Sequence, residues 1–214
     1  MQVKINDEEY DEETINIMTL GNSSVGKTSF IIKYIEDTFQ EVYLATVGID
    51  FKIKNIIIKD KHYKLYFYDT TGQEKYKSLS FNIIKNAHGI LLMYDVTNES
   101  SFESIPEWIR NIKELKGDNF PMILLGNKID IINKRKISKE KGEDLAEENK
   151  IDFFETSNKE GINIEEAGLA IVNKILEKRQ RDTLDYSNTS SRSSQLRKDT
   201  RSLNEGESKK CCGS

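Results

Sequence analysis

Eight residues early in the chain have a spacing that is typical of phosphate-binding loops. They read Gly21-Asn22-Ser23-Ser24-Val25-Gly26-Lys27-Thr28 and match the pattern G-x-x-x-x-G-K-[ST]. The glycines let the backbone curl until successive N–H groups face an anion, and Lys27 offers that anion a positive charge. The Thr28 hydroxyl is a hard oxygen ligand of the kind that Mg²⁺ prefers. The stretch predicts a site for a phosphate chain and a magnesium ion, and the alternative is a plain turn before a helix.

A second group of candidate residues follows an apolar strand pattern at Asp69-Thr70-Thr71-Gly72-Gln73. An acid at the end of a strand beside a phosphate-binding loop can hold Mg²⁺, and Gly72 can bring its N–H against a γ-phosphate because it has no Cβ. The pattern D-x-x-G by itself also fits an ordinary turn. Its distance along the chain from the phosphate-binding loop favours the metal and phosphate role.

A third group suits a purine base. The sequences Asn127-Lys128-Ile129-Asp130 and Ser157-Asn158-Lys159 each follow a further apolar run. The Asp130 carboxylate can accept two hydrogen bonds from guanine, whereas adenine presents an acceptor to it, a mismatch that can reach on the order of 10⁴-fold. The aliphatic stem of Lys128 can cover one face of the base, and Phe39 an edge or the other face. An exposed Asp in a polar loop is the alternative explanation of this motif.

Alternating strand and helix patterns must position these groups. A three-residue turn, Lys59-Asp60-Lys61, joins the second and third strands into an antiparallel hairpin. The remaining strands alternate with helical patterns, which predicts a mostly parallel sheet covered on both faces. The predicted strands are 14–20, 48–59, 62–69, 89–95, 121–126 and 152–156.

Two helix starts carry capping signals. Ser138 is predicted as the N-cap of a helix that ends near Lys150. Before Trp108, both Ser100-x-x-Glu103 and Ser104-x-x-Glu107 fit a capping box, and Pro106 is compatible only with the second. Trp108 itself is predicted to be a packing residue.

Composition excludes several classes of protein. The 214 residues are 36% hydrophobic and 32% charged with a formal net charge of −4, and their longest apolar runs are strand-sized, which argues against an integral membrane protein. The 2 cysteines are adjacent, which argues against a disulfide framework. The acidic balance disfavours binding to nucleic acid. We expect an acidic N-terminal arm at 1–13, a nucleotide-binding domain at 14–180 and a disordered tail at 181–214.

Taken together, these motifs resemble the small GTPases of the Ras superfamily, and within it the Rab family. The resemblance covers about 14–180 and the last residues of the chain. It implies an α/β fold: a three-layer P-loop small G-domain with a six-stranded, mostly parallel sheet, one antiparallel edge strand and five helices. Besides the motifs above, it rests on Thr46-Val47-Gly48-Ile49-Asp50-Phe51 and Leu92-Met93-Tyr94-Asp95-Val96-Thr97.

The resemblance also implies a role for individual residues. Gln73 is the catalytic residue that orients the attacking water. Magnesium is held by Thr28, Thr46 and Asp69. The nucleotide, GTP or GDP, is bound by Gly21, Ser23, Ser24, Val25, Gly26, Lys27, Thr28, Ser29, Phe39, Thr46, Gly72, Asn127, Lys128, Asp130, Ser157, Asn158 and Lys159.

Two single positions and one surface depart from the family pattern. Thr71 and Asn158 both stand where the family usually has alanine, and the first of these lies beside Gln73. The surface that binds effectors is assigned to Ile49, Phe51, Tyr68 and Ile83. The usual Phe–Trp–Tyr triad of this surface is aligned with Phe51, Tyr68 and Ile83, so it differs from the family pattern.

The partners implied by the resemblance are an exchange factor, a GTPase-activating protein, a GDP-dissociation inhibitor, an escort protein and effectors, acting on a monomer. Cys211 and Cys212 resemble double-cysteine endings that carry geranylgeranyl groups, with a single farnesyl group on Cys211 as the alternative. The implied location is the cytoplasmic face of an intracellular membrane, in exchange with the cytosol.

The resemblance predicts a membrane-anchored GTPase that cycles between GTP- and GDP-bound states in vesicle trafficking, with slow hydrolysis accelerated by an activating protein. Two other classes stay open at this point. One is a scaffold that binds GTP and hydrolyses it little, and the other is a different P-loop enzyme such as a nucleoside monophosphate kinase.

Overall fold

The computed structural model describes residues 13–39, 49–70 and 84–184. The chain divides into two units, 1–174 and 175–214. In the second unit, residues 175–184 are helical, so the first four residues of the predicted tail are helical. The division into arm, domain and tail otherwise stays a prediction.

The first unit is built on a six-stranded sheet. Its strands are β1 (Glu13–Leu20), β2 (Ile49–Ile58), β3 (Lys61–Thr70), β4 (Gly89–Asp95), β5 (Met122–Asn127) and β6 (Asp152–Thr156). They lie in the order β2-β3-β1-β4-β5-β6. The pair β2–β3 is antiparallel and every other neighbouring pair is parallel, which confirms the predicted fold class.

Burial along each strand follows from its residues. All seven residues of β4 and all six of β5 are buried, as their continuous apolar sequences predict for parallel strands covered on both faces. β3 alternates between buried and half-buried positions because only one face of the hairpin lies on the core. Lys59 and Asp60 have φ angles of 50° and 62°, so the hairpin has a two-residue turn with both central residues left-handed, one residue shorter than predicted.

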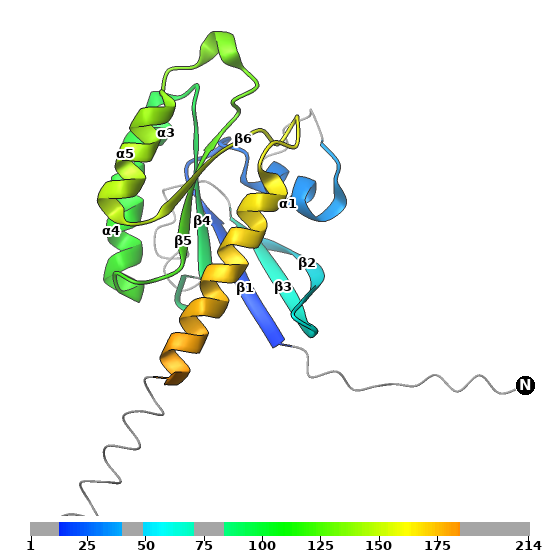
Figure 1. Cartoon of the computed structure of the whole chain (residues 1–214). Helices are drawn as coiled ribbons and strands as arrows, with labels where there is room; N and C mark the ends of the chain where they lie inside the picture. Colours follow the sequence, from blue (N-terminus) through cyan, green and yellow to red (C-terminus); the bar gives the residue numbers. More distant parts are fainter. Residues whose placement is uncertain (1–12, 40–48, 71–83, 185–214) are drawn as a thin grey trace, which may run out of the picture. The chain divides into compact units, whose positions relative to one another are not determined.

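In the described part of the first unit, the helices are α1 (Lys27–Glu36), α3 (Glu99–Glu103), α4 (Ile105–Lys116), α5 (Lys139–Asn149) and the helical residues 84–86 and 164–174, with a short 3-10 helix η2 (Ile132–Lys134). Figure 1 shows α3, α4 and α5 on one side of the sheet and α1 on the other. On the first side, Ile105, Ile109 and Ile112 of α4 pack with Leu92 and Tyr94 of β4 in one buried cluster.

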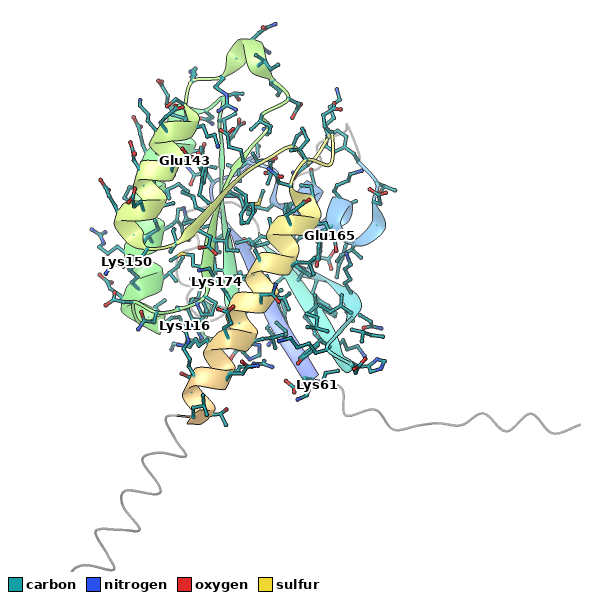
Figure 2. The ribbon with its side chains drawn as sticks, in the orientation of Figure 1. Lys61, Lys116, Glu143, Lys150, Glu165 and Lys174 are labelled. Carbon is teal, nitrogen blue, oxygen red and sulfur yellow. The ribbon has the colours of Figure 1, made fainter. Side chains whose placement is uncertain are left out.

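On the face of the sheet that α1 covers, the ring of Tyr34 packs against the rings of two phenylalanines. Its ring centroid is 6.2 Å from that of Phe30 and 5.2 Å from that of Phe67 on β3. Gly168 leaves the space that this ring fills, because a Cβ there would lie 2.2 Å from Tyr34 Cε2. Farther along the same helix lies Lys174, labelled in Figure 2. Its ammonium is 3.0 Å from the Asp152 carboxylate. These contacts fix residues 164–174 to α1 and to β6.

The predicted helix starts are confirmed in part. The Ser138 hydroxyl accepts from the Lys141 N–H at 3.4 Å and caps α5, as expected. Of the two capping boxes considered before Trp108, the one at Ser100 was wrong, whereas Ser104 does stand at the N-cap position of α4 but makes no capping hydrogen bond among the residues described. Asn98 caps α3 by accepting from the Ser100 N–H, and the backbone at Ser104 is already helical, so within the described residues its hydroxyl does not cap α4. Pro106 does stand in the first turn of α4, as the second alternative required.

Five strands run parallel, so their carboxyl ends lie at one edge of the sheet: Leu20, Thr70, Asp95, Asn127 and Thr156. The three groups of candidate residues stand at or directly after the ends of β1, β3, β5 and β6. The first group follows β1, whose two neighbours β3 and β4 come later in the chain. Ligands of open α/β sheets bind outside such a point.

In the described part of the chain, no helix has the length and apolar character needed to cross a membrane.

Candidate functional site: a nucleotide-binding edge

The loop between β1 and α1 has the backbone that its glycines permit. Gly21, Ser24 and Gly26 all have positive φ angles, of 135°, 64° and 105°. A Cβ on Gly21 would lie 2.1 Å from the Met93 carbonyl oxygen, so the loop backs directly on β4 and only glycine fits there. The phosphate-binding loop is therefore formed by local sequence and by close contact with the neighbouring strand.

The two reactive side chains at the start of α1 are held in place. Lys27 is only 4% exposed, and its ammonium donates to the carbonyl oxygens of Gly21 and Asn22 at 2.9 and 2.8 Å. The Thr28 hydroxyl donates to Asp69 Oδ2 at 2.5 Å. A hydroxyl and a carboxylate oxygen this close together are both hard ligands, so the pair fits a magnesium ion.

The loop after β5 contacts the phosphate-binding loop. Asn127 is 1% exposed, and its Nδ2 donates to the Val25 carbonyl oxygen at 2.8 Å. Its Oδ1 accepts from the Thr156 hydroxyl at 3.2 Å, which fixes the orientation of the amide from β6. The structure therefore brings together the first and third groups of residues that the sequence singled out, across 102 positions of the chain.

Lys128 forms an ion pair with Asp95, a residue for which the sequence predicted no role. Its ammonium lies 2.8 Å from Asp95 Oδ2 at the end of β4, and the Asp95 side chain is only 9% exposed. The other carboxylate oxygen of Asp95 accepts from the N–H and the hydroxyl of Thr97 at 2.8 and 2.7 Å. Lys128 also has a left-handed backbone, with φ 70°. Asp95 therefore fixes the position of the Lys128 side chain.

The loop after β6 completes this edge. The Ser157 hydroxyl donates to Asp130 Oδ1 at 2.7 Å, which orients that carboxylate, and the same hydroxyl accepts from the Glu160 N–H at 3.0 Å. Asn158 is buried and donates to the Gly26 carbonyl oxygen, whereas Lys159 is exposed. The base-binding candidates thus come from two loops that touch each other and the phosphate-binding loop.

Two side chains, Trp108 of α4 and Ser104 directly before that helix, support the phosphate-binding loop and were not predicted. The Ser104 hydroxyl donates to Asn22 Oδ1 at 2.9 Å, and the Trp108 indole N–H points at the same oxygen at 3.4 Å. Trp108 does pack on the core, as predicted, but it also reaches the site. At Ser104 the sequence showed only a capping-box pattern, which predicts that the hydroxyl caps a helix and not that it contacts Asn22.

Ionisable groups behind the loops keep the site's framework in place. Arg135 makes two hydrogen bonds to the Glu155 carboxylate, at 2.5 and 3.1 Å, and this bonding raises the pKa of Arg135 above its ordinary value. Burial, and next the charge of Glu155, raise the pKa of Tyr94. The Tyr94 ring contacts two positions where a Cβ would not fit, Gly126 and Gly142.

Several predicted residues are outside or at the margin of the described structure. Phe39 is 37% exposed at the end of a described segment. Ile49 begins β2, and Phe51 on the same strand is 53% exposed with its ring centroid 6.2 Å from that of the half-buried Tyr68. Six predicted residues lie outside the described residues: Thr46, Gly72, Gln73, Ile83, Cys211 and Cys212.

Comparison with known proteins gives a consistent result. A model of the Ras family matches residues 16–177. Ras-related protein Rab-13 of Rattus norvegicus is 40% identical over 165 residues, which is 77% of this chain and 81% of the relative. Ras-related protein Rab-3B of Bos taurus is 43% identical over 169 residues, covering 79% and 77%. Ras-related protein Rab-10 of Diplobatis ommata is 39% identical over 178 residues, covering 81% and 89%.

Proposed function

The chain belongs to the Ras family, and within it to the Rab-type small GTPases, and from this membership we propose that it is a membrane-anchored switch. Small GTPases hydrolyse GTP, so the protein is an enzyme, and Rab-type members serve vesicle trafficking. The proposal concerns the details: which residues bind the nucleotide, how its state is sensed and what anchors the protein.

The guanine base binds against the loops after β5 and β6. Asp130 accepts hydrogen bonds from the base, and its carboxylate is oriented for this by the Ser157 hydroxyl. Lys128 lays its aliphatic stem along one face of the base while Asp95 holds its ammonium. Phe39 covers an edge of the base. Asn127 joins the base site to the phosphate site through its bond to Val25.

The phosphates bind in the loop of Gly21 to Ser29, where backbone N–H groups, the start of α1 and Lys27 all favour negative charge. Thr28 and Asp69 hold magnesium, together with Thr46 of the segment outside the described residues. When bound, the ion neutralises phosphate charge. Lys27 donates to two carbonyl oxygens of the same loop, which positions its ammonium beside the anion site.

Hydrolysis and switching depend on residues of 40–48 and 71–83. Gln73 orients the attacking water, and Thr46 and Gly72 contact the γ-phosphate. Loss of that phosphate on hydrolysis removes their contacts and changes the surface that partners bind. The partners are an exchange factor, a GTPase-activating protein, a GDP-dissociation inhibitor, an escort protein and effectors. Geranylgeranyl groups on Cys211 and Cys212 anchor the protein to the cytoplasmic face of an intracellular membrane.

Effectors bind the outer face of the hairpin, which we define as Phe51, Ile53, Ile57, Tyr66 and Tyr68. Phe51, Ile53 and Ile57 are 53, 39 and 64% exposed at alternate positions of β2. Phe51 and Ile53 stand opposite Tyr68 and Tyr66 in the register, so all five lie on one face. Phe51, Ile53, Tyr66 and Tyr68 form an apolar patch, and the polar pair Asn55 and Lys64 separates it from Ile57. An exposed apolar patch of this kind suits an apolar partner surface.

The single observation that carries the proposal is the contact between the base motif and the phosphate loop, Asn127 Nδ2 to the Val25 oxygen at 2.8 Å. Calorimetric titration of the protein with GDP and ADP tests it. We expect tighter binding of GDP, and we expect Asp130→Ala to remove most of the preference while Asp118→Ala, an exposed control, keeps it. Equal binding of GDP and ADP by the unmodified protein would refute the base site.

Single-turnover hydrolysis separates the switch from a GTP-binding scaffold. We expect the unmodified protein to hydrolyse bound GTP on the order of 10⁻⁴ s⁻¹ without an activating protein. Gln73→Leu should slow this step and leave GTP affinity unchanged. If the variant and the unmodified protein hydrolyse at the same rate, Gln73 is not catalytic and the scaffold becomes the better description.

A further inference from the structure

Asn158 connects the loop after β6 to the phosphate-binding loop through its side chain. Its Nδ2 donates to the Gly26 carbonyl oxygen at 2.9 Å, and the residue is only 4% exposed. The same oxygen accepts from the Phe30 N–H at 2.9 Å, the first hydrogen bond of α1. Asn158 therefore bonds at the junction between the phosphate-binding loop and its helix.

This bond forms a pair with that of Asn127. The two asparagine amides donate to consecutive carbonyl oxygens, Asn127 to Val25 at 2.8 Å and Asn158 to Gly26 at 2.9 Å. Both lie against the bare Cα of Gly26, because a Cβ there would be 2.3 Å from one Nδ2 and 2.8 Å from the other. An alanine at position 158 could make no such side-chain bond, so the second amide is a property of this chain's own sequence.

The other half of the Asn158 side chain is not stabilised in the same way. Its Oδ1 is buried and accepts no hydrogen bond within the described residues. Buried acceptors without a donor are uncommon in folded proteins. The hydrogen bond from Nδ2 to the Gly26 carbonyl oxygen is therefore the contact through which this side chain acts on the phosphate-binding loop.

We propose that Asn158 is a positioning residue that holds the phosphate-binding loop in its binding conformation and so slows the release of bound nucleotide. The inference rests on the proposed function, since it assumes that this loop binds the phosphates of GDP. The amide reaches the loop from the base-binding side, so it links base recognition to phosphate binding. A loop that is already ordered loses less conformational entropy when the nucleotide binds.

The experiment measures release of a fluorescent GDP analogue from the full chain after addition of excess GDP. We expect Asn158→Ala to speed release on the order of three- to tenfold, the range that one neutral hydrogen bond supports. Asn158→Asp keeps the shape of the side chain and removes the donor, so it should release at least as fast as the alanine variant. An aspartate variant with the unmodified rate would show that the side chain's volume matters and would overturn the proposal.

Affinity for GMP distinguishes positioning of the loop from direct contact with the base. GMP lacks the β-phosphate, so competition binding should give the same GMP affinity for Asn158→Ala and the unmodified protein within about twofold, while GDP affinity falls. Equal losses for GMP and GDP would place the effect on the base and refute the proposal. Failure of the unmodified protein to bind GDP would refute the proposed function instead.

Discussion

The ion pair between Asp95 and Lys128 should control how long GDP stays bound. In Asp95→Asn the carboxylate becomes an amide, which has a single acceptor oxygen. In the native structure, Thr97 bonds to one carboxylate oxygen of Asp95 and Lys128 pairs with the other. The single amide oxygen can therefore accept either the hydrogen bonds from Thr97 or the hydrogen bond from Lys128, but not both. The ammonium then loses its partner, and the stem of Lys128 is no longer fixed beside the base.

The magnitude follows from the burial of the pair. A hydrogen bond to a charged group contributes about 1.5–3 kcal/mol. The Lys128 side chain is 30% exposed, so water replaces part of what the ammonium loses, and the lower end of the range applies. About 1.5 kcal/mol corresponds to roughly tenfold faster release of GDP.

The assay is release of a fluorescent GDP analogue, with Glu99→Gln as the matched control. Glu99 lies four residues farther along the chain and pairs with Lys136 at 4.0 Å, with both side chains more than half exposed. Such a pair contributes little, so the control should release GDP at the unmodified rate. Lys128→Gln and the double variant complete a cycle, and the two changes should be strongly non-additive. Equal rates for Asp95→Asn and Glu99→Gln, or additive effects in the cycle, would refute the role of the pair.

Three further predictions address stability and the metal. Burial raises the pKa of Tyr94 above its ordinary value near 10, so above that pH the unfolded chain loses a proton that the folded one keeps, and stability falls as pH rises. Tyr94→Phe should therefore reduce the loss of unfolding free energy at alkaline pH, by up to about 1.4 kcal/mol per pH unit. Urea unfolding at several pH values measures this loss, and a pH profile equal to that of the unmodified protein would contradict the prediction. Gly168→Ala gains about 1 kcal/mol of helix propensity but places a Cβ 2.2 Å from the Tyr34 ring. We therefore expect urea unfolding to show a net loss of about 1–3 kcal/mol in unfolding free energy. A variant more stable than the unmodified protein would show that the ring moves freely. Chelation of magnesium should speed GDP release at least about tenfold in the unmodified protein and far less in Thr28→Ala, and equal responses would remove Thr28 from the metal site.

The strands and the order of the motifs could be predicted because both depend on local sequence. Continuous apolar runs identify β4 and β5, and the short turn between two β-rich runs identifies the hairpin. Parallel strands then bring their carboxyl ends to one edge without further information. This is why Asn127 and the phosphate-binding loop could be assigned to one site from the sequence.

The supporting contacts could not be predicted because they depend on packing. Trp108 and Ser104 reach Asn22 across 86 and 82 positions, and nothing in the periodicity of α4 indicates which side chain faces the loop. The capping-box hydrogen bonds could not be predicted for a related reason. Ser100 fits the pattern, but Asn98 precedes it and caps α3. Ser104 does stand at the N-cap of α4, but its backbone is already helical and its hydroxyl donates to Asn22 instead of capping the helix.

The register of the hairpin has a consequence for the two segments that are proposed to sense the γ-phosphate. Ile49 pairs with Thr70 at the last rung of the β2–β3 ladder. The chain leaves that rung in two directions, toward 48 on one strand and toward 71 on the other. Both sensing segments are thus connected to neighbouring residues of the same pair of strands. Loss of the pairing between Ile49 and Thr70 would therefore affect both segments at once. A partner that binds at this one pair of residues would likewise influence both segments.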